Sequence, residues 1–346
     1  METLTNEKIL VIQTAFLGDA ILTLPMIQKL NAINPASVID VISIPSTSGV
    51  FSASPYVNKI YVLDKRGKHR GFKALNRFIS ELKKNKYSKL FSPHRSFRSA
   101  YITLKLRVKD SYGFDNSSFK YAFRYNAEYK ISYHEVRRNL SLIGENTDDD
   151  NWKILPVVIV PDVSKEKLKI YINNRNLSKG FIAVAPGSVW KTKCYPKEYF
   201  IAILKSLASD NYKLILIGGE NDKKICNEIA DQAGRDVLVT AGEFSIVETI
   251  GLLKYAKLLV TNDSAPTHMG MCADIPVLTL YCSTVSRFGF YPYNDKSTFL
   301  SYDELDCKPC GIHGYAQCPI GSFDCALKLT PDFVLQKIND MLNTHE

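Results

Sequence analysis

The chain has 346 residues, of which 45% are hydrophobic, and it carries a formal net charge of +9. This length allows two domains of ordinary size, and the apolar fraction excludes an intrinsically disordered chain. No run of about 18 apolar residues is present, which excludes a transmembrane helix. The N-terminus has no basic stretch followed by an apolar one, so we expect a cytoplasmic protein whose eight cysteines are thiols or metal ligands rather than disulfides.

The positive charge is concentrated in one segment. Residues 59–138 contain 21 Lys or Arg and 6 Asp or Glu, a net charge of +15, which leaves the rest of the chain at −6. A basic segment in an otherwise acidic chain indicates an anionic partner: nucleic acid, a phosphorylated glycolipid or an anionic membrane surface. A solvated, lysine-rich face would give the same count.

The first half of the chain alternates short apolar runs with amphipathic segments. The apolar runs predict strands over residues 7–12, 38–44, 59–63 and 87–92. The first strand leads to a helix at Gly18-Asp19, where the glycine permits a close approach of the backbone. An acidic residue at a helix N-terminus is often only a partner of the helix dipole. His94, Arg95 and Arg98 follow the fourth strand, and basic residues bunched near a helix N-terminus indicate a bound anion.

Residues 145–151 (ENTDDDN) are polar and acidic, and we expect the domain boundary there. The predicted organisation is a first domain over residues 1–155, a second over 156–330 and a final helix within 331–346. Apolar runs in the second half predict strands over residues 181–185, 213–217, 237–239, 257–260 and 277–281. Helical patterns lie between them, and this alternation predicts a parallel sheet with helices on both faces in each half.

Two strands of the second half end in turns of small polar residues. The residues concerned are Gly187, Ser188 and Lys193 after the strand at 181–185, and Asp263, Ser264 and His268 after the strand at 257–260. Because ligands bind at the carboxyl ends of parallel strands, we expect these turns to form two walls of one pocket for a phosphate-containing donor. A serine at a helix start is by default an N-cap, and no GxSxG elbow points to a hydrolase.

Two further loops follow strands of the second half. Gly218 and Gly219 follow the strand at 213–217, and their amides could face a phosphate or a ribose. Phe244 lies in the next loop, where its ring could stack on a base, although a single Phe is more often a packing residue.

Four cysteines lie close together near the end of the chain. They are Cys307, Cys310, Cys318 and Cys325. Four thiols in a cytoplasmic chain could hold one structural zinc ion tetrahedrally. The second pair is spaced more loosely than in a zinc ribbon, so free or redox-sensitive thiols are the alternative.

Taken together, these motifs resemble glycosyltransferase family 9, the heptosyltransferases. The resemblance rests on KILVIQTAFLGDAILTLP near the start, on HEVRRNLSLIG, APGSVWKTKCYP and LIGGENDK, and on VTNDSAPTHMGMCADIPVLTLY, and it covers nearly the whole chain in order. It implies the α/β GT-B fold, in which two Rossmann-like domains with parallel sheets face a cleft. The N-terminal domain would bind the acceptor and the C-terminal domain a nucleotide sugar, commonly ADP-heptose. We expect the final helix to pack back toward the N-terminal domain.

The resemblance also implies roles for individual residues. Asp19 would be the base that takes the proton of the acceptor hydroxyl, in a reaction that inverts the anomeric centre and needs no cofactor. Lys193 would stabilise the charge of the departing diphosphate. The other implied donor-site residues are Gly187, Ser188, Gly218, Gly219, Glu220, Thr240, Phe244, Asp263, Ser264, Ala265 and His268. The implied acceptor-site residues are Gly18, Arg95, Arg98 and Arg137.

We therefore expect an inverting glycosyltransferase that moves heptose, or a related sugar, from an ADP-sugar to a lipopolysaccharide core or a similar glycan. Cys282 stands where many family members carry Gly, and the loop after it is unlike theirs, which leaves the sugar open. The basic segment would attract a phosphorylated acceptor and attach the protein to the inner face of the membrane, without nucleic acid as a partner. The alternatives are another nucleotide-sugar enzyme, such as an epimerase or a phosphorylase, and a non-catalytic protein that binds anionic glycan or nucleic acid. No sequence pattern of a common nucleic-acid-binding domain supports the last.

Overall fold

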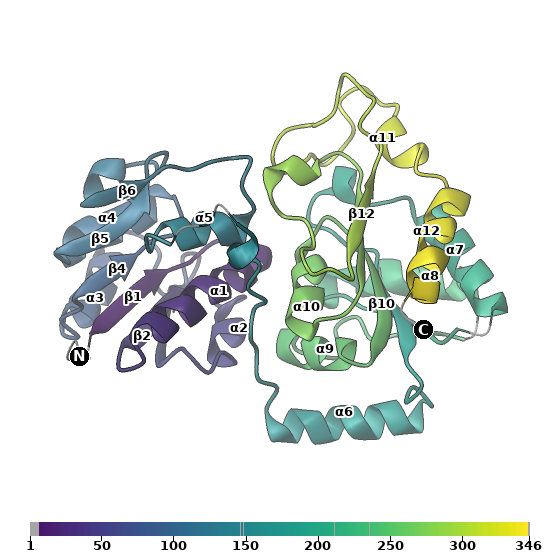
Figure 1. Ribbon diagram of the computed structural model, residues 1–346, viewed down its shortest axis with the longest axis horizontal. Coiled ribbons are helices and arrows are strands. Elements are labelled where there is room, and N and C mark those ends of the chain that lie inside the picture. Colours follow the sequence, from purple (N-terminus) through teal and green to yellow (C-terminus); the bar gives the residue numbers. More distant parts are fainter. Residues whose placement is uncertain (1–6, 146, 148, 211, 235, 345–346) are drawn as a thin grey trace. The chain divides into compact units, whose positions relative to one another are not determined.

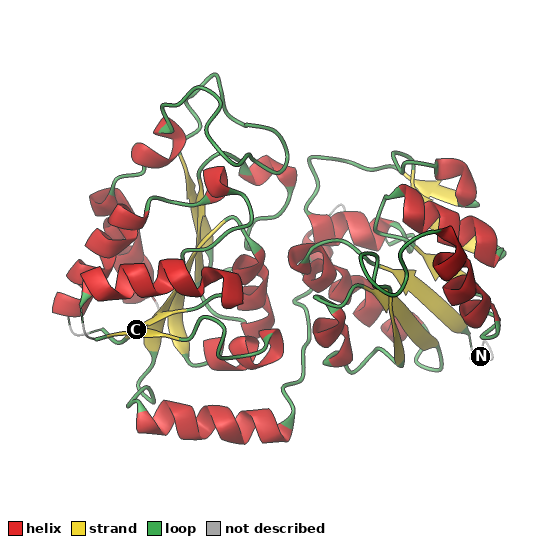
Figure 2. Cartoon of the chain, turned by 180° about the vertical axis from the view of Figure 1, so that it is seen from behind, coloured by secondary structure: helices red, strands yellow, loops and turns green. Residues whose placement is uncertain are grey.

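The structure is a computed structural model, and it describes residues 7–145, 147, 149–210, 212–234 and 236–344 (Figure 1). The chain divides into two compact units, Met1–Ile159 and Val160–Glu346. In each unit, helices surround a central parallel sheet, as the view from behind also shows (Figure 2). No helix in the described part of the chain is both long enough and apolar enough to cross a membrane.

Unit 1 contains a six-stranded parallel sheet in the order β3-β2-β1-β4-β5-β6. Its strands are β1 (Lys8–Ile12), β2 (Val38–Ser43), β3 (Lys59–Val62), β4 (Lys89–Phe91), β5 (Asp110–Phe114) and β6 (Tyr125–Ala127). Its helices are α1 (Leu17–Ile33), α2 (Ser48–Ser52), α3 (Phe72–Lys83), α4 (Phe97–Leu106) and α5 (Glu135–Ser141), with the 3-10 turns η1 (Lys120–Ala122) and η2 (Asp150–Trp152). The strands predicted from the first four apolar runs are confirmed.

The core of unit 1 explains why these segments fold as they do. Apolar residues of β1, β2 and β4 pack against the buried faces of α3 and α4. Every residue of α1 from Ala20 to Ile27 is buried, so this helix is enclosed on most sides. Helix α5 packs on α1, and the side-chain amide of Asn139 donates to the carbonyl oxygen of Leu22 at 3.0 Å. Burial of each large apolar side chain contributes roughly 1.5–3 kcal/mol.

Unit 2 repeats this plan with the strand order β12-β11-β10-β7-β8-β9. Its strands are β7 (Phe181–Ala185), β8 (Leu214–Leu216), β9 (Val237–Val239), β10 (Ala256–Asn262), β11 (Val277–Tyr281) and β12 (Thr298–Ser301). Its helices are α6 (Asp162–Asn174), α7 (Lys197–Ser209), α8 (Lys223–Ala233), α9 (Ile246–Leu253), α10 (Ala265–Ala273), α11 (Asp324–Leu327) and α12 (Pro331–Thr344), with the 3-10 turns η3 (Lys191–Lys193), η4 (Glu220–Asp222) and η5 (Ser286–Phe288).

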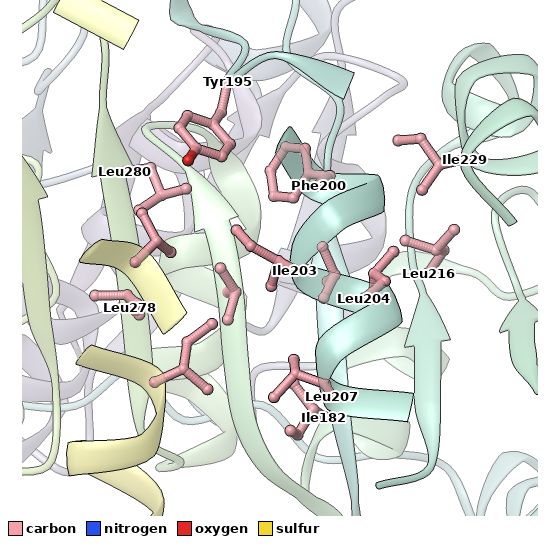
Figure 3. Packing of buried hydrophobic residues seen from close by; sticks show 14 of the residues in the cluster. Ile182, Tyr195, Phe200, Ile203, Leu204, Leu207, Leu216, Ile229, Leu278 and Leu280 are labelled. Carbon is pink, nitrogen blue, oxygen red and sulfur yellow. The ribbon is translucent and has the colours of Figure 1, made fainter. Parts of the chain in front are cut away.

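The core of unit 2 forms between its sheet and helices α7, α8 and α12. Figure 3 shows part of this core, where apolar side chains of α7 meet those of the strands: Ile182, Phe200, Ile203, Leu204, Leu207, Leu216, Leu278 and Leu280. Val334 and Ile338 of α12 are fully buried in the same core. The apolar face of the final helix therefore packs into unit 2, because its buried residues match the apolar surface of α7 and the sheet.

Six helices and strands have no counterpart in the sequence prediction: β5, β6, β12, α2, α6 and α11. The segments DSYGF and YNA of β5 and β6 lack an apolar run. They are held by the neighbouring strands and by rings, since Tyr112 stacks on Phe91 and on Tyr125 with centroid distances of 4.7 and 4.8 Å. Helix α6 buries only Leu168 and Ile172, which is too few for a clear helical period in the sequence.

Candidate active site

The first candidate group lies just beyond the carboxyl end of β1, in unit 1. A short loop leads from this strand into α1, and the half-buried Gly18 and Asp19 lie in the first turn of the helix. The helix dipole favours a carboxylate at this position. Burial raises the pKa of Glu135 on α5, and the charge of Asp19 adds to this shift. Asp19 therefore lies near a second carboxyl group, one that the sequence does not single out.

Glu135 belongs to a buried ion pair on α5. Nε of Arg138 lies 2.8 Å from Oε2 of Glu135, and the two side chains are 1% and 7% exposed, respectively. The guanidinium groups of Arg138 and Arg95 lie 4.7 and 3.9 Å from the centre of the Tyr129 ring. Burial raises the pKa of Glu135 to about 7, whereas the charges of Arg138 and Arg95 oppose this shift. The predicted base thus lies beside a charge network that is largely closed to water.

Positively charged side chains gather near the carboxyl ends of β3 and β4. The ammonium of Lys65 donates to the carbonyl oxygen of Thr14 at 2.6 Å, and Nδ1 of His94 lies 2.8 Å from the Thr14 hydroxyl. Burial, together with the charge of Arg98, lowers the pKa of Lys65 to about 8. Burial lowers the pKa of His94 to about 4, with help from the charges of Lys65 and Arg95, so its imidazole is neutral near pH 7. Lys65, Arg95 and Arg98, the cation cluster, are suited to an anion.

Two of the three arginines expected at the acceptor site belong to this cluster. Lys65, which completes the cluster, was not predicted, although its position two residues after the strand at 59–63 could have indicated it. Arg137 has other partners: its guanidinium lies 3.5 Å from the centre of the Tyr133 ring, and its Nε donates to the hydroxyl of Thr147 at 3.1 Å.

The second candidate group lies in unit 2, beyond the carboxyl ends of β7 and β10. The ammonium of Lys193, on the turn η3, lies 2.6 Å from Oδ2 of Asp263. The hydroxyl of Thr284 donates to the same carboxylate oxygen at 2.6 Å. The side chains of Lys193 and Asp263 are 14% and 10% exposed, so their charges attract each other with little screening by water. The two turns predicted to form one pocket therefore meet through their charged residues.

Asn262, the last residue of β10, ties the same two turns together. Its side chain accepts from the backbone N–H of Tyr195 at 2.9 Å and donates to the carbonyl oxygen of Pro186 at 2.7 Å. The hydroxyl of Ser264 donates to the carbonyl oxygens of Asn262 and Gly187 at 3.3 and 3.5 Å. Ser264 precedes α10, but its side chain makes no capping hydrogen bond. Ser264 thus occupies the N-cap position of α10, as its default interpretation has it, but its hydroxyl does not cap the amides at the start of this helix.

The predicted glycines of the donor site make room for a carboxylate of the same unit. A Cβ atom on Gly187 would overlap the side chain of Asp222, and a Cβ on Gly218 would lie 2.6 Å from the Cβ of Asp222. The backbone N–H of Gly219 donates to Oδ2 of Asp222 at 2.9 Å. These glycines thus have a packing role, apart from any approach of a ligand to the backbone.

Three other predicted donor residues lie around the loops after β8 and β9. Thr240 is buried, and its hydroxyl donates to the carbonyl oxygen of Leu216 at 3.3 Å. Glu220 lies on η4, and its carboxylate is 3.7 Å from the ammonium of Lys223. Phe244 contributes to a cavity of about 440 Å³ on the surface of α6, lined by Lys167, Ile170, Tyr171, Asn174, Arg175 and Phe244. The Phe244 ring meets Tyr171 edge-on, with a centroid distance of 5.2 Å.

His268 lies on α10 and is only 3% exposed. Burial lowers its pKa to about 4, and the charge of Asp263 opposes this shift. Its Nδ1 atom is buried and has no hydrogen-bond partner among the described residues. The imidazole is therefore neutral near pH 7, which fits the support of the Asp263 loop better than a charge contact with phosphate.

The four late cysteines are free thiols, with Cys307, Cys310 and Cys318 partly exposed and Cys325 buried. Within the described residues, no group of three or more His, Cys, Asp or Glu side chains could hold a metal ion. The structure thus does not support the structural zinc ion that the spacing of these cysteines permits. The segment is anchored by Lys308 instead, whose buried ammonium donates to the Tyr281 and Tyr302 carbonyl oxygens and the Ser301 hydroxyl at 2.9, 3.1 and 2.7 Å.

The same segment holds the turn that carries Lys193. The backbone N–H of Thr192 donates to the carbonyl oxygen of Tyr315 at 3.1 Å, and the N–H of Tyr315 donates back to the Thr192 hydroxyl at 2.8 Å. The hydroxyl of Ser283 donates to that of Thr192 at 3.0 Å. Gly314 has a φ of +80°, and a Cβ there would lie 2.9 Å from the Thr192 hydroxyl. We call Thr192, Ser283 and Tyr315 the Thr192 clasp; it fixes the backbone next to Lys193.

Comparison with known proteins gives one consistent result. A sequence model of glycosyltransferase family 9 (heptosyltransferase) matches residues 75–315. Lipopolysaccharide heptosyltransferase 3 of Escherichia coli is 25% identical over 287 residues, which cover 78% of this chain and 82% of that protein.

Solved structures agree in fold. A family 9 glycosyltransferase from Veillonella parvula superposes with a TM-score of 0.86 at 20% identity, over 98% of both chains. The ADP-heptose lipopolysaccharide heptosyltransferase II of Escherichia coli superposes with a TM-score of 0.78 at 21% identity, over 97% of this chain and 99% of that one. The two six-stranded parallel α/β units are those of the GT-B fold, as expected.

Proposed function

The chain belongs to glycosyltransferase family 9, the heptosyltransferase family, and on that premise we propose that it transfers heptose or a related sugar from an ADP-sugar to a lipopolysaccharide core or a similar glycan, with inversion. The names of its relatives support this donor and acceptor. The observation that carries the proposal is the Lys193–Asp263 pair beside the N-terminus of α10, where family members are expected to hold the donor diphosphate.

In the proposed reaction, the carboxylate of Asp19 takes the proton of the acceptor hydroxyl while that oxygen attacks the anomeric carbon. The bond between this carbon and the diphosphate oxygen breaks, and the diphosphate leaves with its bonding electrons. The ammonium of Lys193 and the amides at the start of α10 stabilise the negative charge that develops there. The reaction needs no cofactor in this scheme, because these groups supply the positive charge.

The acceptor would be an anionic glycan. The cation cluster of Lys65, Arg95 and Arg98 lies at the carboxyl end of the unit 1 sheet, as Asp19 does, and supplies three positive charges. Gly18 lets the acceptor approach the start of α1. Such an acceptor is lipid-linked in this proposal, so the protein would work in the cytoplasm at the inner face of the membrane.

A donor screen and a transfer assay test this function. Calorimetry with ADP-heptose and with ADP-, GDP- and UDP-hexoses should show binding of an ADP-sugar. Transfer to core oligosaccharide should fall by about 10²–10⁴-fold in Asp19→Asn, because the general base is lost, while donor binding stays unchanged. Preference for a UDP-hexose without any transfer would point to an epimerase instead. Full activity of Asp19→Asn would remove Asp19 from the mechanism.

A further inference from the structure

Unit 1 exposes a group of large apolar side chains on α3, α4 and η1. Tyr121 is 79% exposed, Phe72 64%, Phe97 56%, Leu104 49% and Phe119 38%. Apolar residues scattered singly over a surface need no explanation, but a contiguous patch marks a binding surface. The question is therefore whether these side chains lie together.

Spacing and a ring contact place the α3 and α4 residues on one surface, and the turn that carries Phe119 and Tyr121 lies beside α4. Phe97, Tyr101 and Leu104 are four and three residues apart on α4, so they share one face of the helix. The ring of Phe72, at the start of α3, meets that of Tyr101 edge-on with a centroid distance of 5.6 Å. The turn η1 packs against α4. We call Phe72, Phe97, Tyr101, Leu104, Phe119 and Tyr121 the aromatic surface.

The fold itself does not require this surface. Helix α4 already buries a different face, which contains Ala100, Ile102 and Leu106, in the core of unit 1. Polar side chains on the solvent-exposed face of α4 would not disturb the packing of that core. Four large apolar groups and a tyrosine pair on this exposed side therefore point to a partner.

The charge around the aromatic surface identifies the kind of partner. Lysines lie among its rings: the ammonium groups of Lys105 and Lys120 are 5.6 and 5.8 Å from the ring centres of Tyr101 and Tyr121. The sequence contains no Asp or Glu in residues 82–109 or 116–127, which supply most of this surface. The partner must then be anionic and must also accept apolar side chains.

We propose that the aromatic surface docks on an anionic phospholipid bilayer. Aromatic side chains favour the boundary between headgroups and acyl chains, and lysines beside them attract anionic headgroups. This proposal assigns a surface to the membrane attachment included in the proposed function, and it rests on that part of it. It also explains why the exposed rings of α4 and η1 occur with cations and not with carboxylates.

Vesicle flotation tests the docking. The wild-type protein should float with vesicles of phosphatidylglycerol and phosphatidylcholine, and not with phosphatidylcholine alone. The triple variant Phe97→Ser/Leu104→Ser/Tyr121→Ser should bind at least about tenfold more weakly, because all three side chains are exposed and contribute by insertion. The matched control Val163→Ser/Leu327→Ser/Phe333→Ser removes three exposed apolar side chains from unit 2 and should bind like wild type.

A second pair of variants tests the charge. Lys105→Gln and Lys120→Gln should each weaken binding about fivefold, whereas Lys169→Gln and Lys205→Gln, exposed on unit 2, should not. Transfer to a water-soluble core oligosaccharide reports separately on the proposed function and should be unchanged in all these variants. Equal vesicle binding by the wild type and the triple variant would overturn the proposal. So would binding of a single-stranded oligonucleotide, in place of vesicles, that depends on the same residues.

Discussion

The two units hold the cations at the carboxyl ends of their sheets in different ways. In unit 2, the ammonium of Lys193 is 2.6 Å from the carboxylate of Asp263, which Thr284 also fixes. In unit 1, Lys65 donates to a backbone carbonyl oxygen and Arg95 lies over an aromatic ring. Among the described residues, no carboxylate forms an ion pair with Lys65, Arg95 or Arg98.

This difference suggests two kinds of ligand site. A cation that is already paired and hydrogen-bonded keeps its position without a ligand, so the unit 2 site is preorganised for a transition-state charge. Cations that lack a carboxylate partner repel one another when no anion is bound, and burial further raises the free energy of their charged form. We therefore expect unit 2 to be sensitive to geometry and unit 1 to be sensitive to charge and pH.

The largest effect should come from removing the preorganised cation. Lys193→Ala is expected to lower kcat/KM for sugar transfer by about 10²–10³-fold, because the departing diphosphate loses a fixed positive group. Steady-state kinetics measure this loss. Lys191→Ala changes an exposed lysine on the same turn and serves as the matched control. Equal losses in the two variants would mean that the net charge of the turn matters, and not the position of Lys193.

The ion pair between Arg138 and Glu135 in unit 1 is buried, and breaking it should lower the stability of the protein. Arg138→Met leaves the buried carboxyl of Glu135 without its partner, and the free energy of unfolding is expected to fall by about 3–5 kcal/mol. Urea denaturation measures this value. The double variant Glu135→Gln/Arg138→Met should recover much of the loss, since no charge remains unpaired. An equal loss in the double variant would assign the effect to the packing of Arg138 on Tyr129.

The Thr192 clasp should affect donor binding through the position of Lys193. Thr192→Val removes the hydroxyl that accepts from the N–H of Tyr315, and we expect the KM for the donor to rise about 5–10-fold, as for the loss of a buried hydrogen bond. Thr192→Ser keeps the hydroxyl and should restore most of the wild-type value. If Thr192→Val changed kcat but left the donor KM unchanged, the clasp would not act on donor binding through the position of Lys193.

The sequence predicts the parts of the fold that depend on local patterns. FIAVA is apolar throughout and KILVI is apolar after Lys8, so the burial of these strands can be predicted without a structure. Strands β5 and β6 cannot be predicted in this way, because their sequences lack an apolar run and their stability comes from the rings and backbone of the neighbouring strands. The packing of α12 into unit 2 also depends on the tertiary fit of one apolar face, which no local pattern specifies.

For the candidate site, the sequence predicts residues that end strands, and it misses residues that act through packing. Asp263 directly follows β10 and Lys193 lies on the turn that follows β7, and the structure pairs them. Glu135 and Arg138 lie on a helix whose contact with α1 brings them near Asp19, and only the fold shows this. The four cysteines have a spacing that permits a metal site, yet hydrogen bonds from Lys308 anchor the segment instead.

The smallest expected effect is a pH dependence of the acceptor KM. It tests whether the unit 1 cations bind an anionic acceptor. Burial lowers the pKa of Lys65 to about 8, so the ammonium deprotonates as the pH rises through this value. The KM for an anionic acceptor should then rise a few-fold between about pH 7 and pH 9, since one of three cations is lost. Between pH 8 and the ordinary value of 10.5, the unfolded chain binds more protons at this residue, so the free energy of unfolding should increase with pH.

Lys65→Arg sharpens this test, because a guanidinium stays charged throughout the range. The acceptor KM of this variant should no longer depend on pH near 8, while Lys68→Arg, at an exposed position of the same loop, should behave like wild type. The donor KM should show no such dependence in any of these proteins, since Lys65 belongs to unit 1 and the proposed donor site to unit 2. If the donor KM and the acceptor KM showed the same pH dependence, the effect would not be specific to Lys65 and the acceptor site. The difference between a paired and an unpaired cation would then not explain it.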